Sequence, residues 1–236
     1  MEISRYLAMT SIEMDVFSEV EGHFPAYMAC HFSPYGTGLS NIPNSLPENA
    51  MLILNDRTPI HGHDPEVITA QLLQALEQLR FKSVLLDFQR RDQTETQRLC
   101  RHLIQALPCP IGVSEFYAKG LDCPVFLSPA PLDQSLGEYL DGWQGRELWL
   151  DMALDSACIT VTEGGSTTTP LPFSPVPEDA FVEEVLHCLY RAEVTSDKIR
   201  FYLWRNLPQL ESLLEEAQSL GVTKAIGLYQ QLCADK

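Results

Sequence analysis

The strongest constraint on the fold is an alternation of short β-type runs with helical segments along the chain. Between several of the runs, apolar residues recur with the helical period, most clearly from Val67 to Leu79 and from Leu99 to Leu107. Alternation of this kind is typical of parallel strands joined by helices. The runs with strand character are residues 26–32, 51–55, 83–88, 110–114, 124–128, 147–152, 198–204 and 224–229.

A chain of 236 residues is long enough for one (β/α)₈ barrel. An open, doubly wound sheet would show the same alternation, but no glycine-rich phosphate loop follows any of the predicted strands. We therefore predict the α/β class and a compact TIM-type barrel, with residues 1–236 forming a single domain.

Two segments interrupt the alternation. Residues 33–48 are rich in Pro, Gly, Ser and Asn, and predict a long loop. Residues 158–171 read ITVTEGGSTTTPL from Ile159 onward, which is typical of a β-hairpin that turns at Gly164 and Gly165. The barrel is therefore expected to carry a β-hairpin insertion near residues 157–171.

The charge of the chain limits its partners. Sixteen Lys and Arg residues stand against 32 Asp and Glu residues, for a formal net charge of -16. Such a surface repels phosphate backbones and anionic lipid headgroups, so we expect neither nucleic acid nor a membrane as partner.

Cysteine usage and hydropathy indicate the compartment. The seven cysteines are scattered without a C-x-x-C pair, which is typical of buried thiols in a reducing environment. The first 17 residues include Glu2, Arg5, Glu13 and Asp15, so they contain no apolar signal-peptide core. No run approaches the roughly 20 apolar residues of a membrane span. These features predict a cytoplasmic location.

Polar and aromatic residues follow the predicted strands, at the end where barrels build their active sites. Carboxylates and amides hydrogen-bond sugar hydroxyls, and aromatic faces pack against the C–H faces of sugar rings. The sequence therefore predicts a small carbohydrate or glycoside as ligand. The residues at these strand ends are Asn55, Asp56, Asp87, Gln89, Ser114, Glu115, Ser128, Asp151, Trp204, Arg205, Tyr229 and Gln230.

The most specific segment is FKSVLLDFQR, residues 81–90, in which strand alternation places Leu85, Asp87 and Gln89 on one face. This segment resembles the catalytic strand of the family 18 glycoside hydrolases, the chitinase group, whose pattern is D-x-x-D-x-D-x-E. The alignment puts Gln89 at the final glutamate and Asp87 at the last aspartate. Leu85 and Lys82 occupy the two earlier acidic positions.

The resemblance implies a chemistry. In that family the final glutamate protonates the leaving oxygen, while the aspartate two residues earlier holds the acetamido group that acts as nucleophile. An amide has no proton to donate at a useful pKa, so Gln89 could bind a glycosidic oxygen but not serve as the acid.

A second similarity lies near the C-terminus. KAIGLYQQ is similar to the last barrel strand of the same family, whose G-x-x-W supplies a tryptophan under the sugar, and Tyr229 would replace that tryptophan. The strand order departs from the family. The Asp87 strand is third in our count, whereas the family's catalytic strand is fourth, unless residues 5–10 form an uncounted first strand.

Our first hypothesis is a glycoside-hydrolase-like barrel that binds a carbohydrate without the usual family acid. Its candidate substrate-binding residues are Gln89, Asn55, Asp151, Trp204 and Tyr229, with Asp87 as the aspartate of the catalytic strand.

The second hypothesis is an active glycosidase in which Glu115 or Asp151 serves as acid opposite Asp87, which makes Asp87 and Glu115 the candidate catalytic residues. Glu115 would point into the barrel only if Ile111 and Val113, which share its strand parity, also do so.

A third hypothesis is a metal-dependent hydrolase using His61 and His63 of the IHGHD segment, whose alternative interpretation is a solvated loop. His31, at a strand end, is interpreted as a pocket or core histidine, and Trp143 and Trp149 as core residues. No P-loop, nucleophile elbow or dinucleotide fingerprint is present, and we expect no cofactor.

Overall fold

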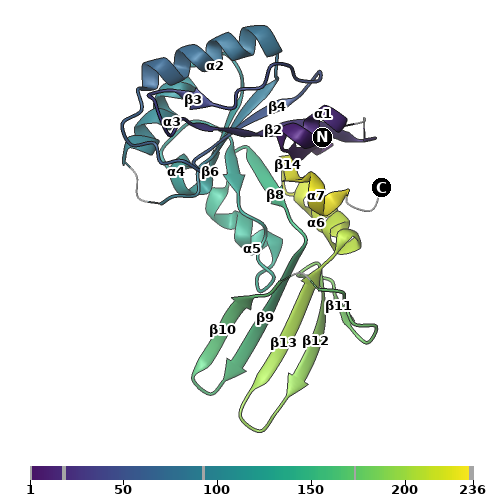
Figure 1. The fold of residues 1–236 in the computed structure, drawn as a ribbon. Helices are drawn as coiled ribbons and strands as arrows, with labels where there is room; N and C mark the ends of the chain where they lie inside the picture. Colours follow the sequence, from purple (N-terminus) through teal and green to yellow (C-terminus); the bar gives the residue numbers. More distant parts are fainter. Residues whose placement is uncertain (1, 18–19, 92–93, 173, 234–236) are drawn as a thin grey trace.

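The computed structural model describes residues 2–17, 20–91, 94–172 and 174–233. Eight parallel strands form a barrel, which closes because β1 pairs with both β2 and β14 (Figure 1). The predicted TIM-type barrel is therefore confirmed. The barrel strands are β1 (Ser4–Met9), β2 (His23–Phe32), β4 (Met51–Asn55), β5 (Ser83–Asp87), β6 (Ile111–Ser114), β7 (Val125–Leu127), β8 (Leu148–Met152) and β14 (Val222–Leu228).

Two elements of the predicted strand count are wrong. Residues 198–204 do not join the barrel, because β13 (Ile199–Arg205) pairs antiparallel with strands outside it. The missing strand is β1, which confirms the alternative that residues 5–10 form an uncounted first strand and makes the Asp87 strand the fourth of the barrel. The error has a simple cause: a run of alternating apolar residues shows that a strand forms, but not which strand it pairs with.

Helices follow most of the barrel strands and cover the outside of the barrel. Asp64 caps α2 by accepting from the Glu66 N–H, with Pro65 at the first helical position, and Asn206 caps α6 by accepting from the Gln209 N–H. The helices are α1 (Ser11–Val16), α2 (Pro65–Leu79), α3 (Thr94–Ala106), α4 (Glu115–Ala118), α5 (Leu136–Leu140), the 3₁₀ helix η1 (Asp141–Trp143), α6 (Leu207–Ser219) and α7 (Tyr229–Leu232).

The predicted loop at residues 33–48 contains one two-residue strand, β3 (Leu39–Ser40), which pairs antiparallel with the end of β2. Within the described ranges, no helix has both the length and the apolar character needed to cross a bilayer.

The core has two layers. The larger layer lies between the outer faces of the strands and the helices. The smaller layer fills the barrel, where Trp149 is fully buried and confirms the core prediction, and Trp143 is half-buried beside the outer layer. The residues inside the barrel are Tyr6, Ala8, Ala26, Met51, Ile53, Leu85, Phe126, Trp149 and Ile226.

A second sheet of five antiparallel strands is inserted after β8 and extends away from the barrel (Figure 1). Its first two strands form the predicted hairpin as part of a larger insertion, with the turn at residues 163–164, one position before the predicted Gly164 and Gly165. In spatial order the strands are β10 (Gly165–Pro170), β9 (Asp155–Thr162), β13, β12 (Cys188–Val194) and β11 (Phe181–Glu183).

Arg205, at the end of β13, ties the inserted sheet to the barrel. Its guanidinium is buried and donates to the carbonyl oxygens of Ala130, Leu186 and His187. His187 in turn hydrogen-bonds the carboxylate of Glu216 on α6. The insertion is therefore anchored by buried polar groups that would lose their partners if it separated from the barrel.

We predict that Gly112→Ala destabilises the fold. A Cβ on Gly112 would lie 2.2 Å from two carbons of the Trp149 ring, and a fully buried indole has no free space into which to move. The free energy of unfolding, measured by urea denaturation, should fall by about 1–3 kcal/mol. Gly142→Ala is the matched control, because nothing lies within 4 Å of its Cβ. An equal effect of the two substitutions would contradict this account of the barrel interior.

Candidate functional site

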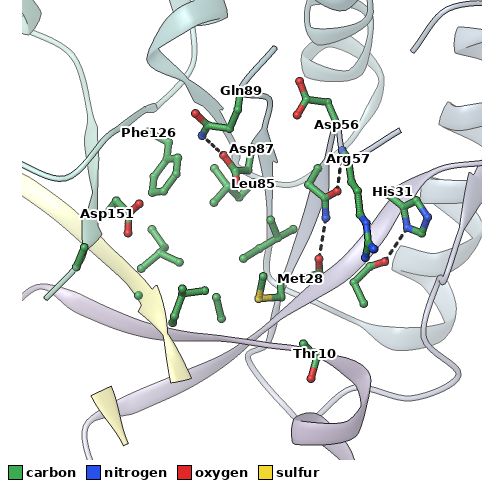
Figure 2. A pocket seen from close by; sticks show the side chains of 18 of the residues that line it. Thr10, Met28, His31, Asp56, Arg57, Leu85, Asp87, Gln89, Phe126 and Asp151 are labelled. Atoms are coloured by element: carbon green, nitrogen blue, oxygen red, sulfur yellow. Dashed lines mark hydrogen bonds between the residues drawn. The ribbon is translucent and has the colours of Figure 1, made fainter. Parts of the chain in front are cut away.

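A cavity of about 500 Å³ opens at the carboxyl ends of the barrel strands (Figure 2). Its inner end is apolar and is formed by Ile53, Leu85, Phe126 and Ile226, which belong to the barrel interior. Its polar lining comes from Thr10, His31, Asn41, Asn55, Asp56, Arg57, Asp87, Gln89, Asp151 and Gln231. An apolar cavity with a limited set of polar groups is the usual form of a small-molecule site.

Asp87 and Gln89 reach the cavity from the end of β5. The predicted alternation is observed: Leu85 lies in the barrel interior, while Leu86 and Phe88 pack on the outer side. The Gln89 amide nitrogen donates to Asp87 Oδ1. Burial raises the pKa of Asp87, the bond from Gln89 lowers it, and the charge of Asp56 raises it further.

Asp151 enters the same cavity from β8, two residues beyond Trp149 and on the same face of the strand. Burial raises the pKa of Asp151 to about 7, with the charges of Asp87 and Asp155 adding to the effect. This carboxyl can therefore hold a proton near neutral pH, when an ordinary aspartate is ionised.

The opposite wall in Figure 2 carries His31 and Arg57. A bulge in β2 between Tyr27 and Cys30 shifts the register by one residue, so that His31 and not Cys30 pairs with Asn55 of β4. At this bulge the Asn55 side chain donates to the Met28 carbonyl oxygen over 2.8 Å. Asn55 lines the cavity and also joins the ends of β2 and β4.

Glu115 lies outside the residues that line the cavity. Its parity partners Ile111 and Val113 pack in the outer core layer, so the condition for an inward-pointing Glu115 is not met. Glu115 begins α4, and its carboxylate accepts from the backbone N–H and the hydroxyl of Ser128 on the neighbouring strand end. This arrangement joins two loops at the barrel mouth.

Trp204 and Tyr229 are also absent from the cavity lining. Trp204 is buried in the inserted sheet, stacks on Tyr202 and donates from its indole to Ser174. Tyr229 begins α7 and packs edge-on against Phe17. The structure thus brings together Asn55, Asp87, Gln89 and Asp151 of the predicted set and separates the two aromatic residues from them.

His61 and His63 lie in the loop before α2. His63 has both ring nitrogens within hydrogen-bond distance of backbone carbonyl oxygens, at 2.7 Å from Ile60 and 2.9 Å from Ser33. His61 is exposed, with Nδ1 3.6 Å from a Glu95 carboxylate oxygen. Among the described residues, no three His, Cys, Asp or Glu side chains are grouped so that they could hold a metal ion.

Sequence reasoning missed Arg57 and Phe126. The candidate residues were polar side chains at the ends of predicted strands, such as Asn55. Arg57 follows Asn55 by two residues, so a search that continued two positions past the strand would have included it. Phe126 lies within β7, in a three-residue strand whose inward face is not visible from so short a pattern.

Comparison with known proteins gives structural matches only, because no protein-family model and no curated protein sequence matches the chain. The spore cortex-lytic enzyme SleL of Bacillus cereus superposes with a TM-score of 0.54 at 9% identity, covering 96% of this chain and 70% of SleL. The chain has a chitinase-like barrel fold.

Two further solved structures have a similar fold. A chitinase from Chromobacterium violaceum matches with a TM-score of 0.53 at 7% identity, covering 97% of this chain and 95% of the chitinase. SleL of Bacillus megaterium matches with a TM-score of 0.52 at 8% identity, covering 96% of this chain and 70% of that protein. At such identities the likeness concerns the fold and carries no residue roles.

We predict that Asp151→Asn stabilises the fold in a pH-dependent manner. The Asp151 pKa is higher in the folded state, at about 7, than its ordinary value near 4. The native state therefore holds a proton that the unfolded chain has lost, and stability falls as pH rises from about 4 to about 7. Urea denaturation should show Asp151→Asn more stable than the natural protein by at least about 1 kcal/mol at pH 8, and no such gain at pH 4.

Asp122→Asn, at an exposed loop position, is the control and should give no pH-dependent gain. A loss of stability in Asp151→Asn at pH 8 would show that the ionised carboxylate stabilises the cavity, contrary to this prediction.

Proposed function

We propose that this chitinase-like barrel binds a carbohydrate in the cavity at its mouth and lacks the acid that the chitinase pattern requires. The observation that carries the proposal is the pair formed by Gln89 and Asp87 at the cavity. Gln89 occupies the position of the proton-donating glutamate in the resemblance, and its amide donates to Asp87. An amide can hold a glycosidic oxygen but cannot protonate it.

The cavity has the chemistry that a sugar requires. Phe126 and the aliphatic side chains at the inner end offer apolar surface to the C–H faces of a ring. Asn41, Thr10 and Gln231 offer neutral donors and acceptors for hydroxyl groups at the rim. The volume of about 500 Å³ lies in the range of small-molecule sites.

The strand position of Asp87 supports the resemblance. Asp87 ends the fourth barrel strand, the place of the catalytic strand in the chitinase group, and it points into the cavity with Leu85 below it. In that group the aspartate at this position holds an acetamido group. We infer that Asp87 binds such a group, or a hydroxyl, without a covalent step.

We predict that the natural protein binds chitotetraose, measured by titration calorimetry, and that Asp87→Asn weakens binding about tenfold. Loss of a hydrogen bond to a charged group corresponds to about 1.5–3 kcal/mol, which is one to two decades of affinity. Asp122→Asn should bind as the natural protein does. Unchanged affinity in Asp87→Asn would remove Asp87 from the site, and failure of neutral and acidic glycans alike to bind would contradict the proposal.

A second candidate is an active glycosidase in which Asp151 is the acid and Asp87 the second carboxylate. The observation that favours it is the raised pKa of Asp151, at about 7, in a cavity shared with Asp87. Pairs of carboxyls whose environments separate their pKa values are the pattern of acid and base in glycosidases.

Turnover of aryl N-acetylglucosaminides separates the two functions. We predict no turnover by the natural protein and measurable turnover by Gln89→Glu, because the glutamate would restore a proton donor two residues from Asp87. Turnover by the natural protein that Asp151→Asn abolishes, and that declines as pH rises past about 7, would instead establish the second candidate. Glu115→Gln should leave either activity unchanged, since Glu115 lies outside the cavity.

A further inference from the structure

We propose that the ligand of this cavity carries a carboxylate, and that Arg57 binds it with His31 beside it. The inference rests on the proposed carbohydrate binding and adds the chemical class of the sugar. It assigns Arg57 as the residue that selects an acidic sugar, such as a hexuronic acid, over its neutral counterpart.

The backbone of Arg57 is fixed at both of its polar atoms. Its N–H donates to Asn55 Oδ1 over 3.1 Å, and its carbonyl oxygen accepts from Arg90 Nη2 over 3.0 Å. The two partners are themselves held, because Asn55 donates to the Met28 carbonyl and Arg90 Nε donates to the Asp56 carbonyl. The loop that presents Arg57 is thus organised before any ligand arrives, which favours affinity.

The guanidinium of Arg57, by contrast, has no hydrogen-bond or ion-pair partner among the residues that the structure describes. Figure 2 shows its side chain running along the cavity wall toward His31. The chain has twice as many acidic as basic residues, so partners for an arginine are abundant. An unpaired guanidinium lining a cavity in such a chain is available to an incoming anion.

His31 adds a second polar group to the same wall. Its Nδ1 lies 3.0 Å from the carbonyl oxygen of Ala29, so Nδ1 carries the hydrogen of that bond, and Nε2 has no partner in the described part of the chain. The register shift in β2 is what brings His31 level with Asn55 and hence close to Arg57.

Two of the three acidic residues that line the cavity lie away from this wall. In Figure 2, Asp87 and Asp151 are on the side of Phe126, and Arg57 and His31 are on the other. Asp56 is buried and accepts from the Arg90 N–H. A ligand that is neutral at one end and carries a single negative charge at the other fits this division, and a planar carboxylate matches the two-pronged geometry of one guanidinium. A phosphate, with up to two charges near three aspartates, fits less well.

The experiment compares matched sugars by titration calorimetry on the full chain. Methyl β-glucuronide is paired with methyl β-glucoside, and N-acetylmuramic acid with its neutral methyl ester. We expect the acidic member of at least one pair to bind about tenfold or more tightly than the neutral member, and Arg57→Gln to abolish that preference. Arg101→Gln, an exposed arginine on α3, is the matched control and should retain the preference. Added salt should weaken only the acidic member.

The outcomes separate this inference from the proposed function. Neutral and acidic sugars that bind equally, or an acidic preference that Arg57→Gln leaves intact, would overturn the role of Arg57 while carbohydrate binding stands. Arg57→Gln that weakens both members equally, at an unchanged melting temperature, would also overturn it. Glucose 6-phosphate that binds as tightly as the glucuronide would overturn the carboxylate assignment, and binding of no sugar in the panel would overturn both proposals.

Discussion

The interior of an eight-stranded barrel has to be filled by side chains, and Trp149 is the largest of those that fill this one. Its indole lies against Gly112 so closely that a methyl group could not be added there. The Lys224 ammonium lies 4.0 Å from the centre of its ring on the side where β14 begins. Trp149 therefore closes the lower part of the barrel, and the cavity is confined to the layer above Leu85 and Phe126.

This filling also determines the electrostatics of the site. Because water is excluded below, the carboxyls that stand just above the apolar layer are poorly solvated, and burial is the main cause of the raised pKa values of Asp87 and Asp151. The other wall is different, since it is built from the ends of β2 and β4 and the loop after β4. Polar atoms of this wall bond one another, and the Arg57 guanidinium has no partner among the described residues. One cavity thus offers a protonatable end and a cationic end, each arising from its own part of the barrel.

The alternation of side chains between the two faces of a strand allowed much of the site to be predicted. In β5 the order of Leu85, Asp87 and Gln89 on one face follows from the strand period alone, and the same holds for Asp151 after Trp149. The direction of Glu115 could not be predicted, because parity needs a reference that the sequence did not supply: Gly112 and not Val113 faces the interior. In the four-residue strand β6, which contains Gly112, the apolar pattern does not show which residues face the barrel interior.

By itself, the sequence determined that parallel strands alternate with helices, that a hairpin interrupts them near residues 157–171, and that Leu85, Asp87 and Gln89 share one face of their strand. These are local properties, set by residue period and turn chemistry. Tertiary structure alone decided that β1 closes the barrel while β13 leaves it, and that Trp204 lies in an inserted sheet, away from the cavity. It also decided that Arg57 and His31 share a wall, because strand partners and a register shift depend on contacts between distant segments.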